Sequence, residues 1–149
     1  MAHTALEVAR WFLAYNRNEE DERGAERISN LKLQKLLYYA QGCYLALYGK
    51  PLFSDDIVAW THGPVVVNVY HAYKANGANG IPFTEDFDMS QFSDEENDVL
   101  TQVYNTFGQY SAWKLRDMTH AEEPWLSTKQ ECVISNQKIR DYFQKKYIE

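Results

Sequence analysis

The stretch SNLKLQKLLYYAQGCYLALY, residues 29–48, predicts a single helix of about five turns. Ser29 stands where an N-cap residue belongs, because its hydroxyl can accept a hydrogen bond from a backbone N–H of the first turn. Gly49 follows the last periodic residue and Pro51 comes two positions later, a pattern typical of a helix end. Both ends of this helix are therefore predicted from local sequence.

Apolar residues cover most of the circumference of this predicted helix. One stripe at three- and four-residue spacing contains Leu33, Leu36, Leu37, Ala40, Cys43, Tyr44 and Leu47. A second stripe contains Leu31, Tyr38, Gly42 and Leu45, and the polar remainder is Lys32, Gln34, Lys35 and Gln41. A helix of this kind is normally buried, so we expect the other elements to pack around it. Glycine costs about 1 kcal/mol against alanine inside a helix, so Gly42 indicates the close approach of a neighbour.

Four further segments complete the first part of the expected fold. Residues 2–17 predict a first helix whose inner face contains Leu6, Ala9, Phe12 and Leu13. Residues 16–27 are mostly charged and are interpreted as an exposed, mobile connection, with a helical extension to Gly24 as the alternative. Residues 57–60 suit a short strand, and residues 131–134 are expected to pair with it.

The remaining segments are predicted mainly from helix-start signals. Gly63-Pro64 is expected to open a helix, although Val65–Val67 would also fit a strand. An irregular stretch at 81–92 is expected to be anchored by Phe83, Phe87 and Phe92. Ser93 with Glu96 forms a capping box, Ser111 caps a helix at about 112–120, Pro124-Trp125 breaks the chain, and Ser135 caps a last helix. The expected fold class is mainly α, with about six helices around the helix at 29–48 and a small two-stranded β element.

Length and composition bound the class of protein. The chain has 149 residues, of which 45% are hydrophobic, so we expect one domain spanning 1–149. Neither a membrane span nor a signal peptide is indicated. Cys43 and Cys132 lack the spacing of a disulfide framework or a zinc motif. An intracellular, reducing location in the cytoplasm is therefore expected.

The net charge of −6 is concentrated in one segment. Between Lys74 and Lys114 there is no lysine or arginine. The acidic residues of this interval are Glu85, Asp86, Asp88, Asp94, Glu95, Glu96 and Asp98. These are seven of the 21 acidic residues, which leaves 14 against 15 basic residues elsewhere. An acidic face suits a basic protein partner and argues against nucleic acid, while the alternative interpretation is a solvated face without a partner.

No pattern in the sequence indicates catalysis or a cofactor. The histidines, His3, His62, His71 and His120, include no pair at helical metal-binding spacing. Cys43 falls on the apolar stripe, where thiols are usually inert. Neither a phosphate-binding glycine motif nor a nucleophile elbow occurs in the chain. We therefore expect no metal, no cofactor and no enzymatic activity.

Two local clusters remain as candidate functional residues. One is Trp60, His62, Gly63 and Pro64 in the run WTHGP, and the other contains His120 and Trp125 in the run THAEEPW. One interpretation places both indoles in the core, with both histidines bonded to backbone at helix ends. The other is a partner or ligand surface where the two turns meet. The partner-binding candidates are these six residues together with Glu85, Asp86, Asp88, Asp94, Glu95 and Asp98.

Three motifs make the chain resemble the Panacea domain family, which includes SocA-like antitoxins and phage-associated GepA-like proteins. They are LQKLLYYAQGCYLALYGKPLF at 33–53, IVAWTHGPVVVNVYHAYK at 57–74, and L-x-x-M-T-H-A-E-x-P-W at 115–125. The resemblance extends to IxxYF at 139–143, while the charged stretch at 16–27 lies outside the motifs. It implies a mostly helical domain that serves as the antitoxin of a two-gene pair.

The leading functional hypothesis is thus an antitoxin that binds a co-encoded toxin protein directly. Whether it would act by occlusion or by delivering the toxin for degradation is left open by the sequence. One alternative is a small hydrolase or metal-binding enzyme built on His62 and His120. A further alternative is a DNA-binding autoregulator, against which the missing basic helix argues.

Overall fold

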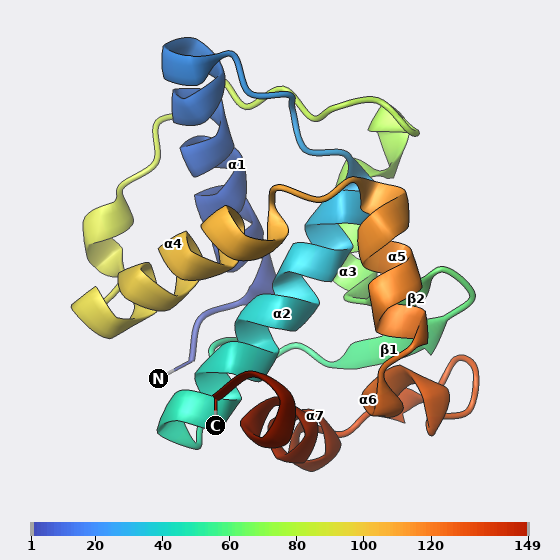
Figure 1. The fold of residues 1–149 in the computed structure, drawn as a ribbon. Coiled ribbons are helices and arrows are strands. Elements are labelled where there is room, and N and C mark those ends of the chain that lie inside the picture. The colour runs from blue at the N-terminus through green and yellow to red at the C-terminus, as the bar shows by residue number, and fades with distance from the viewer. Residues whose placement is uncertain (1, 149) are drawn as a thin grey trace.

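The helix predicted at 29–48 is the central element of the structure (Figure 1). In the computed structural model, which describes residues 2–148, α2 spans Asn30–Tyr48. Ser29 Oγ accepts from Lys32 N, and Gly49 ends the helix in the left-handed conformation with φ 72°. Both predicted ends are confirmed.

The burial of α2 extends to polar residues and stops short of one apolar residue. Gln34, Lys35 and Gln41, from the polar remainder of the helix, are fully buried, and each has a hydrogen-bond partner inside the fold. Leu47 was placed on the inner stripe, but its side chain is 48% exposed, because the last turn of α2 extends beyond its neighbours.

Several helices pack against α2, and one of these contacts explains its glycine. They include α1 (Ala5–Arg23), α3 (Val67–Tyr73), α4 (Asp94–Phe107), α5 (Ala112–His120) and α7 (Asn136–Phe143). The Phe143 ring of α7 lies directly against Gly42, so that a methyl group there would overlap the ring. The close approach expected at Gly42 is confirmed. The mainly α fold class is also confirmed, with seven α-helices and three strands among residues 2–148.

The first helix is longer than predicted. α1 continues to Arg23 and ends at Gly24, which has φ 69°. The alternative for residues 16–27, a helical extension to Gly24, is therefore confirmed in place of a mobile connection, because glutamate and arginine are good helix formers. Asn16 is buried, donating to Glu26 O at 2.9 Å and accepting from Ile28 N at 3.1 Å. The inner face of α1 also differs, since Leu6 is 40% exposed.

The sheet has three strands rather than two. β1 (Ile57–Trp60) pairs antiparallel with β3 (Val133–Ile134), as predicted, and also with β2 (Gly63–Val65), in the order β2-β1-β3. Gly63-Pro64 therefore does not open a helix, and the next helix, α3, spans Val67–Tyr73. The reason is the tight turn at Thr61-His62, which pairs Trp60 with Gly63 and returns the chain along β1.

The later segments largely match the prediction. One short 3-10 helix, η1 (Lys74–Asn76), precedes the irregular stretch at 81–92, and another, η2 (Met89–Gln91), lies within it. In this stretch Phe83 and Phe92 are buried, while Phe87 is half-buried. The capping box of Ser93 and Glu96 is present. Pro124-Trp125 does not break the chain but lies in a one-turn helix, α6 (Glu123–Leu126), since proline fits a first turn.

The C-terminal part of the structure continues from α7 into one π-helical turn, η3 (Gln144–Ile148). Ser135 caps α7, as predicted, and Ile139 and Phe143 are buried. Within residues 2–148, no helix is both long and apolar enough to cross a membrane.

Candidate functional site

The two clusters singled out in the sequence meet in the structure. Trp125 Nε1 donates to the backbone carbonyl of Trp60 at 2.8 Å. The His120 ring stacks on the Trp125 ring with centroids 4.0 Å apart. We call the residues Trp60–Pro64 and Thr119–Trp125 the junction. It brings all six turn candidates together, because β1, β2, α5 and α6 are adjacent at one side of α2 (Figure 1).

A buried lysine from α2 underlies the junction. Lys35 Nζ donates to the carbonyl of Pro64 at 3.0 Å, and its side chain is fully buried. Gly63 has φ 113°, and a Cβ at that position would lie 2.8 Å from Thr119 Oγ1 and 2.9 Å from Lys35 Cε. A larger residue would therefore push the β1–β2 turn away from α5. Burial, reinforced by the Arg116 cation, lowers the pKa of Lys35 to about 7.

A buried glutamate holds the other end of the junction. Glu122 is 4% exposed, and its carboxylate accepts from Tyr38 Oη at 2.9 Å, Tyr39 Oη at 3.0 Å and Tyr147 Oη at 2.6 Å. Burial raises the pKa of Glu122, and the three hydroxyl donors oppose that rise. The carboxylate thereby connects α2, the turn before α6, and η3.

Sequence reasoning missed Lys35, Glu122 and the three tyrosines as parts of the junction. Charged residues are almost never fully buried unless paired, so pattern alone argues for exposure. Glu122 does lie inside the third motif, and Lys35, Tyr38 and Tyr39 lie inside the first. For these four residues, their place in the motifs at 33–53 and 115–125 is the sequence signal that could have indicated a shared role.

The titratable groups of the junction make contacts within the fold. His62 Nδ1 accepts from Arg116 Nε at 3.2 Å. The pKa of His120 is lowered by burial and by the Arg116 cation, and its Nε2 is buried without a hydrogen-bond partner among residues 2–148. Burial, followed by the Glu122 carboxylate, raises the pKa of the half-buried Cys43 thiol to about 12. No group of three or more His, Cys, Asp or Glu side chains suited to a metal occurs in the described part of the chain.

The outer face of the junction carries an exposed indole. Trp113 is 59% exposed near the N-terminus of α5. The Arg116 guanidinium lies 5.0 Å from its ring centroid, and the His62 ring meets it edge-on at 5.8 Å. Tryptophan and arginine are enriched among residues that dominate binding energy in protein interfaces. This face could therefore anchor a protein partner.

The six acidic candidates lie apart from the junction. They occupy the irregular stretch and the first turns of α4, on the opposite side of α2 from α5 (Figure 1). Glu85 forms an ion pair with Arg10, and Asp88 Oδ1 accepts from Ser90 N at 2.9 Å. The others, Asp86, Asp94, Glu95 and Asp98, are exposed and have neither a hydrogen bond nor an ion pair within residues 2–148. We call the exposed acids of α4, Asp94, Glu95 and Asp98, the acidic flank.

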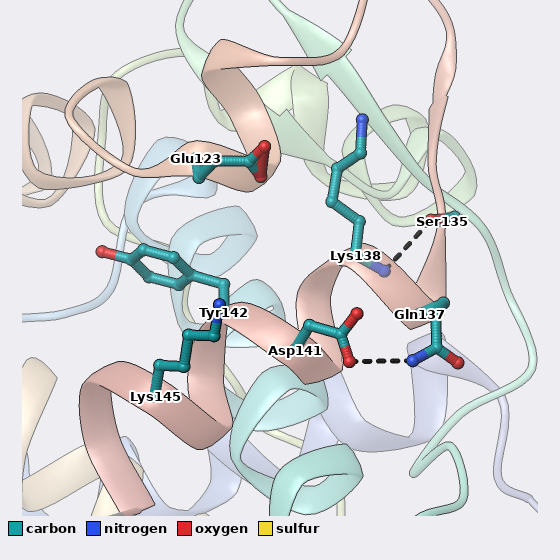
Figure 2. A pocket seen from close by; sticks show the side chains of 7 residues that line it. All are labelled: Glu123, Ser135, Gln137, Lys138, Asp141, Tyr142 and Lys145. Atoms are coloured by element: carbon teal, nitrogen blue, oxygen red, sulfur yellow. Dashed lines mark hydrogen bonds between the residues drawn. The ribbon is translucent and has the colours of Figure 1, made fainter.

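A hollow of about 490 Å³ lies between α6 and α7, and none of its lining residues is among the partner-binding candidates predicted from the sequence (Figure 2). Glu123 and Asp141 face it together with Lys138 and Lys145. Gln137 Nε2 donates to Asp141 Oδ1 at 2.8 Å across one turn of α7. With two acids and two bases, the lining does not favour a ligand of either charge.

Comparison with known proteins places the fold and the junction in one family. The profile described as antitoxin SocA-like, Panacea domain, matches residues 33–126, which run from α2 through the junction to α6. The chain belongs to this family of SocA-like antitoxins.

One relative is the antitoxin SocA of Caulobacter vibrioides (strain NA1000 / CB15N). The two sequences are 35% identical over 109 residues, covering 66% of this chain and 58% of the relative. The chain thus matches less than two thirds of that relative's length. No solved structure matches the chain.

Proposed function

We propose that this chain is the antitoxin of a two-gene pair and neutralises a co-encoded toxin by direct protein–protein binding. The observation that carries this proposal is the family match over residues 33–126, which contains both the junction and the acidic flank. A curated relative with 35% identity is named as an antitoxin. The partner is accordingly the protein encoded beside this one.

The geometry supports binding rather than catalysis as the activity of the junction. Lys35 and Glu122 are buried and bonded within the fold, and His62 is engaged by Arg116. These contacts hold α5 and the β1–β2 turn in fixed positions. Trp113 is consequently presented on a fixed helix, so little conformational entropy would be lost when a partner covers it.

The acidic flank supports a basic partner. Charged residues at the rim of an interface mainly accelerate encounter and contribute less to the lifetime of the complex. Neutralising Asp94 and Asp98 together should therefore lower the association rate constant more than it raises the dissociation rate constant. The difference in association rate constant between this variant and the parent chain should shrink toward molar salt, where the screening length falls to about 3 Å. Glu96 stays unchanged in this variant, because it caps its own helix.

The experiment combines rescue of growth with binding kinetics. The chain is co-expressed with the product of the adjacent gene, and the purified pair is measured by surface plasmon resonance at several salt concentrations. Failure of the parent chain to bind or to rescue growth would remove the antitoxin proposal for that pair. Unchanged kinetics in this charge-neutralised variant, with loss of binding in Trp113→Ala, would instead favour an interface around Trp113, beside the junction.

A further inference from the structure

A second hollow, of about 430 Å³, lies between the end of α2 and the start of α4. Its lining includes two tyrosines, one lysine and the residues of the α4 capping box: Tyr44, Tyr48, Lys50, Ser93, Glu95 and Glu96. None of its lining residues belongs to the junction. All six of these residues lie within the segment matched by the family.

Tyr44 brings an unpartnered polar group to this hollow. Its side chain is only 5% exposed, yet its hydroxyl makes no hydrogen bond within residues 2–148. The hydroxyl oxygen is not among the buried unpaired polar atoms of the described residues, so it is accessible from the hollow that Tyr44 lines. The ring of Tyr48 lies beside it, with centroids 4.8 Å apart and planes inclined by 45°. The two phenols thus form an aromatic wall with one hydroxyl free to bond a ligand.

Charge in the hollow favours a cation. Glu96 is already bound by Ser93 N at 2.8 Å and by His3 Nε2 at 3.0 Å. Glu95, by contrast, is exposed and makes neither a hydrogen bond nor an ion pair within the described residues. The last turn of α2 contains no basic residue to complement its C-terminal carbonyls, which carry about half a negative charge. The positive end of α4 is outweighed by the acids Asp94, Glu95 and Glu96 of its first turn.

We propose that this hollow binds the guanidinium group of an arginine side chain presented by the toxin. The Glu95 carboxylate pairs with the guanidinium, the Tyr44 hydroxyl accepts one of its N–H groups, and the Tyr48 ring stacks against its plane. The identity of the partner rests on the proposed function, while the chemistry of the hollow does not.

Arginine suits this lining better than lysine does. A guanidinium is planar, stacks on aromatic faces and presents five N–H donors in a fixed fork. The Tyr44 hydroxyl remains protonated near neutral pH, because burial and then the Glu96 carboxylate raise its pKa. A neutral phenol keeps lone pairs that can accept from the guanidinium. Lys50, which also lines the hollow, forms no ion pair with Glu95 among the described residues and leaves that carboxylate available.

The first test separates this contact from long-range steering. Glu95→Gln and Tyr44→Phe should each raise the dissociation rate constant of the toxin complex by about 10- to 100-fold, since a hydrogen bond to a charged group contributes about 1.5–3 kcal/mol and about 1.4 kcal/mol is a factor of ten. Asp98→Asn, one turn further along α4, should lower mainly the association rate constant. Glu22→Gln and Tyr15→Phe make the same chemical changes on α1, far along the sequence from the hollow, and serve as controls. Equal dissociation rates in Glu95→Gln and Glu22→Gln would overturn the proposal.

The second test needs no toxin. It shows whether the hollow binds a guanidinium group even if the parent chain does not bind the product of the adjacent gene. N-acetyl-arginine amide is titrated into the ¹⁵N-labelled chain at millimolar concentrations, with the neutral N-acetyl-citrulline amide in parallel. The arginine probe should shift the amide resonances of Tyr48, Lys50 and Glu95, and these shifts should be lost in Glu95→Gln. Shifts spread evenly over the acidic flank, or equal shifts with the citrulline probe, would overturn the assignment of the hollow.

Discussion

Lys35 shows how a single residue can act against the stability of the fold that contains it. Its ammonium group is buried, and the carbonyl of Pro64 is its one hydrogen-bond acceptor among residues 2–148. A buried cation without a counter-ion is costly, which lowers its pKa from 10.5 to about 7. The lysine therefore positions the β1–β2 turn at the expense of the free energy of unfolding.

Replacing Lys35 by methionine should raise the free energy of unfolding at pH 7 by about 1–4 kcal/mol, because an apolar side chain of similar length removes the desolvation cost. Between pH 7 and 10.5 the native lysine is neutral while the unfolded lysine keeps its proton. The parent is therefore stabilised as pH rises through this window, and the advantage of the variant shrinks. Urea unfolding at pH 7 and pH 9 measures both values. A difference that stays constant across this range would contradict the burial of a titrating lysine.

The contacts and burial of some residues could be predicted from the sequence, and those of others could not. The close contact at Gly42 was predictable, because a glycine lowers the stability of a helix and is commonly found where a neighbouring element approaches closely. Glu122 was not, since its three tyrosine donors come from segments that are distant along the chain. Leu47 was placed on the apolar stripe by periodicity alone, but it is 48% exposed. Periodicity identifies an apolar face but not whether a neighbour covers it at a helix end.

Helix starts were the most predictable elements. Ser29, Ser93, Ser111 and Ser135 each accept a backbone N–H from the third residue of the following helix. These contacts are local, so the sequence encodes them without reference to the rest of the fold. β2 was mispredicted because a three-residue strand is stabilised by its pairing with β1 rather than by its own composition. The junction was predictable only as two separate turns, because their contact is long-range.

Loss of one cap tests the contribution of local sequence to an element. Ser93→Ala should lower the free energy of unfolding by about 1 kcal/mol, because the Glu96 N–H loses its side-chain acceptor. Ser54→Ala makes the same substitution at an exposed position outside any helix and should change stability by less than about 0.5 kcal/mol. Urea midpoints of the two variants give the comparison. Equal midpoints would mean that α4 begins independently of its capping box.

At the scale of the whole molecule, the hydrophobic core includes residues that lie outside the segment matched by the family. Trp11 and Phe12 of α1 and Ile139 and Phe143 of α7 are fully buried, and both helices contact α2. All four residues lie outside residues 33–126. If the chain were reduced to the matched segment, α2 would lose its packing against α1 and α7.

A fragment of residues 33–126 should therefore not fold cooperatively, whereas the full chain should. Exposing two faces of α2 removes several buried aromatic residues, each contributing about 1.5–3 kcal/mol, against a total stability of about 5–15 kcal/mol. Thermal unfolding followed by near-ultraviolet circular dichroism distinguishes the two chains. A sharp transition in the fragment would show that α1 and α7 are accessory to the fold.

The stacking of His120 on Trp125 gives the molecule a built-in fluorescent reporter. A protonated imidazole is an efficient electron acceptor for an excited indole, and these rings are 4.0 Å apart. Burial keeps the pKa of His120 below its usual value, so the ring is neutral at pH 7 and Trp125 emits. Emission should fall as the pH drops through that lowered pKa, and the midpoint of this quenching would follow the integrity of the junction without any label.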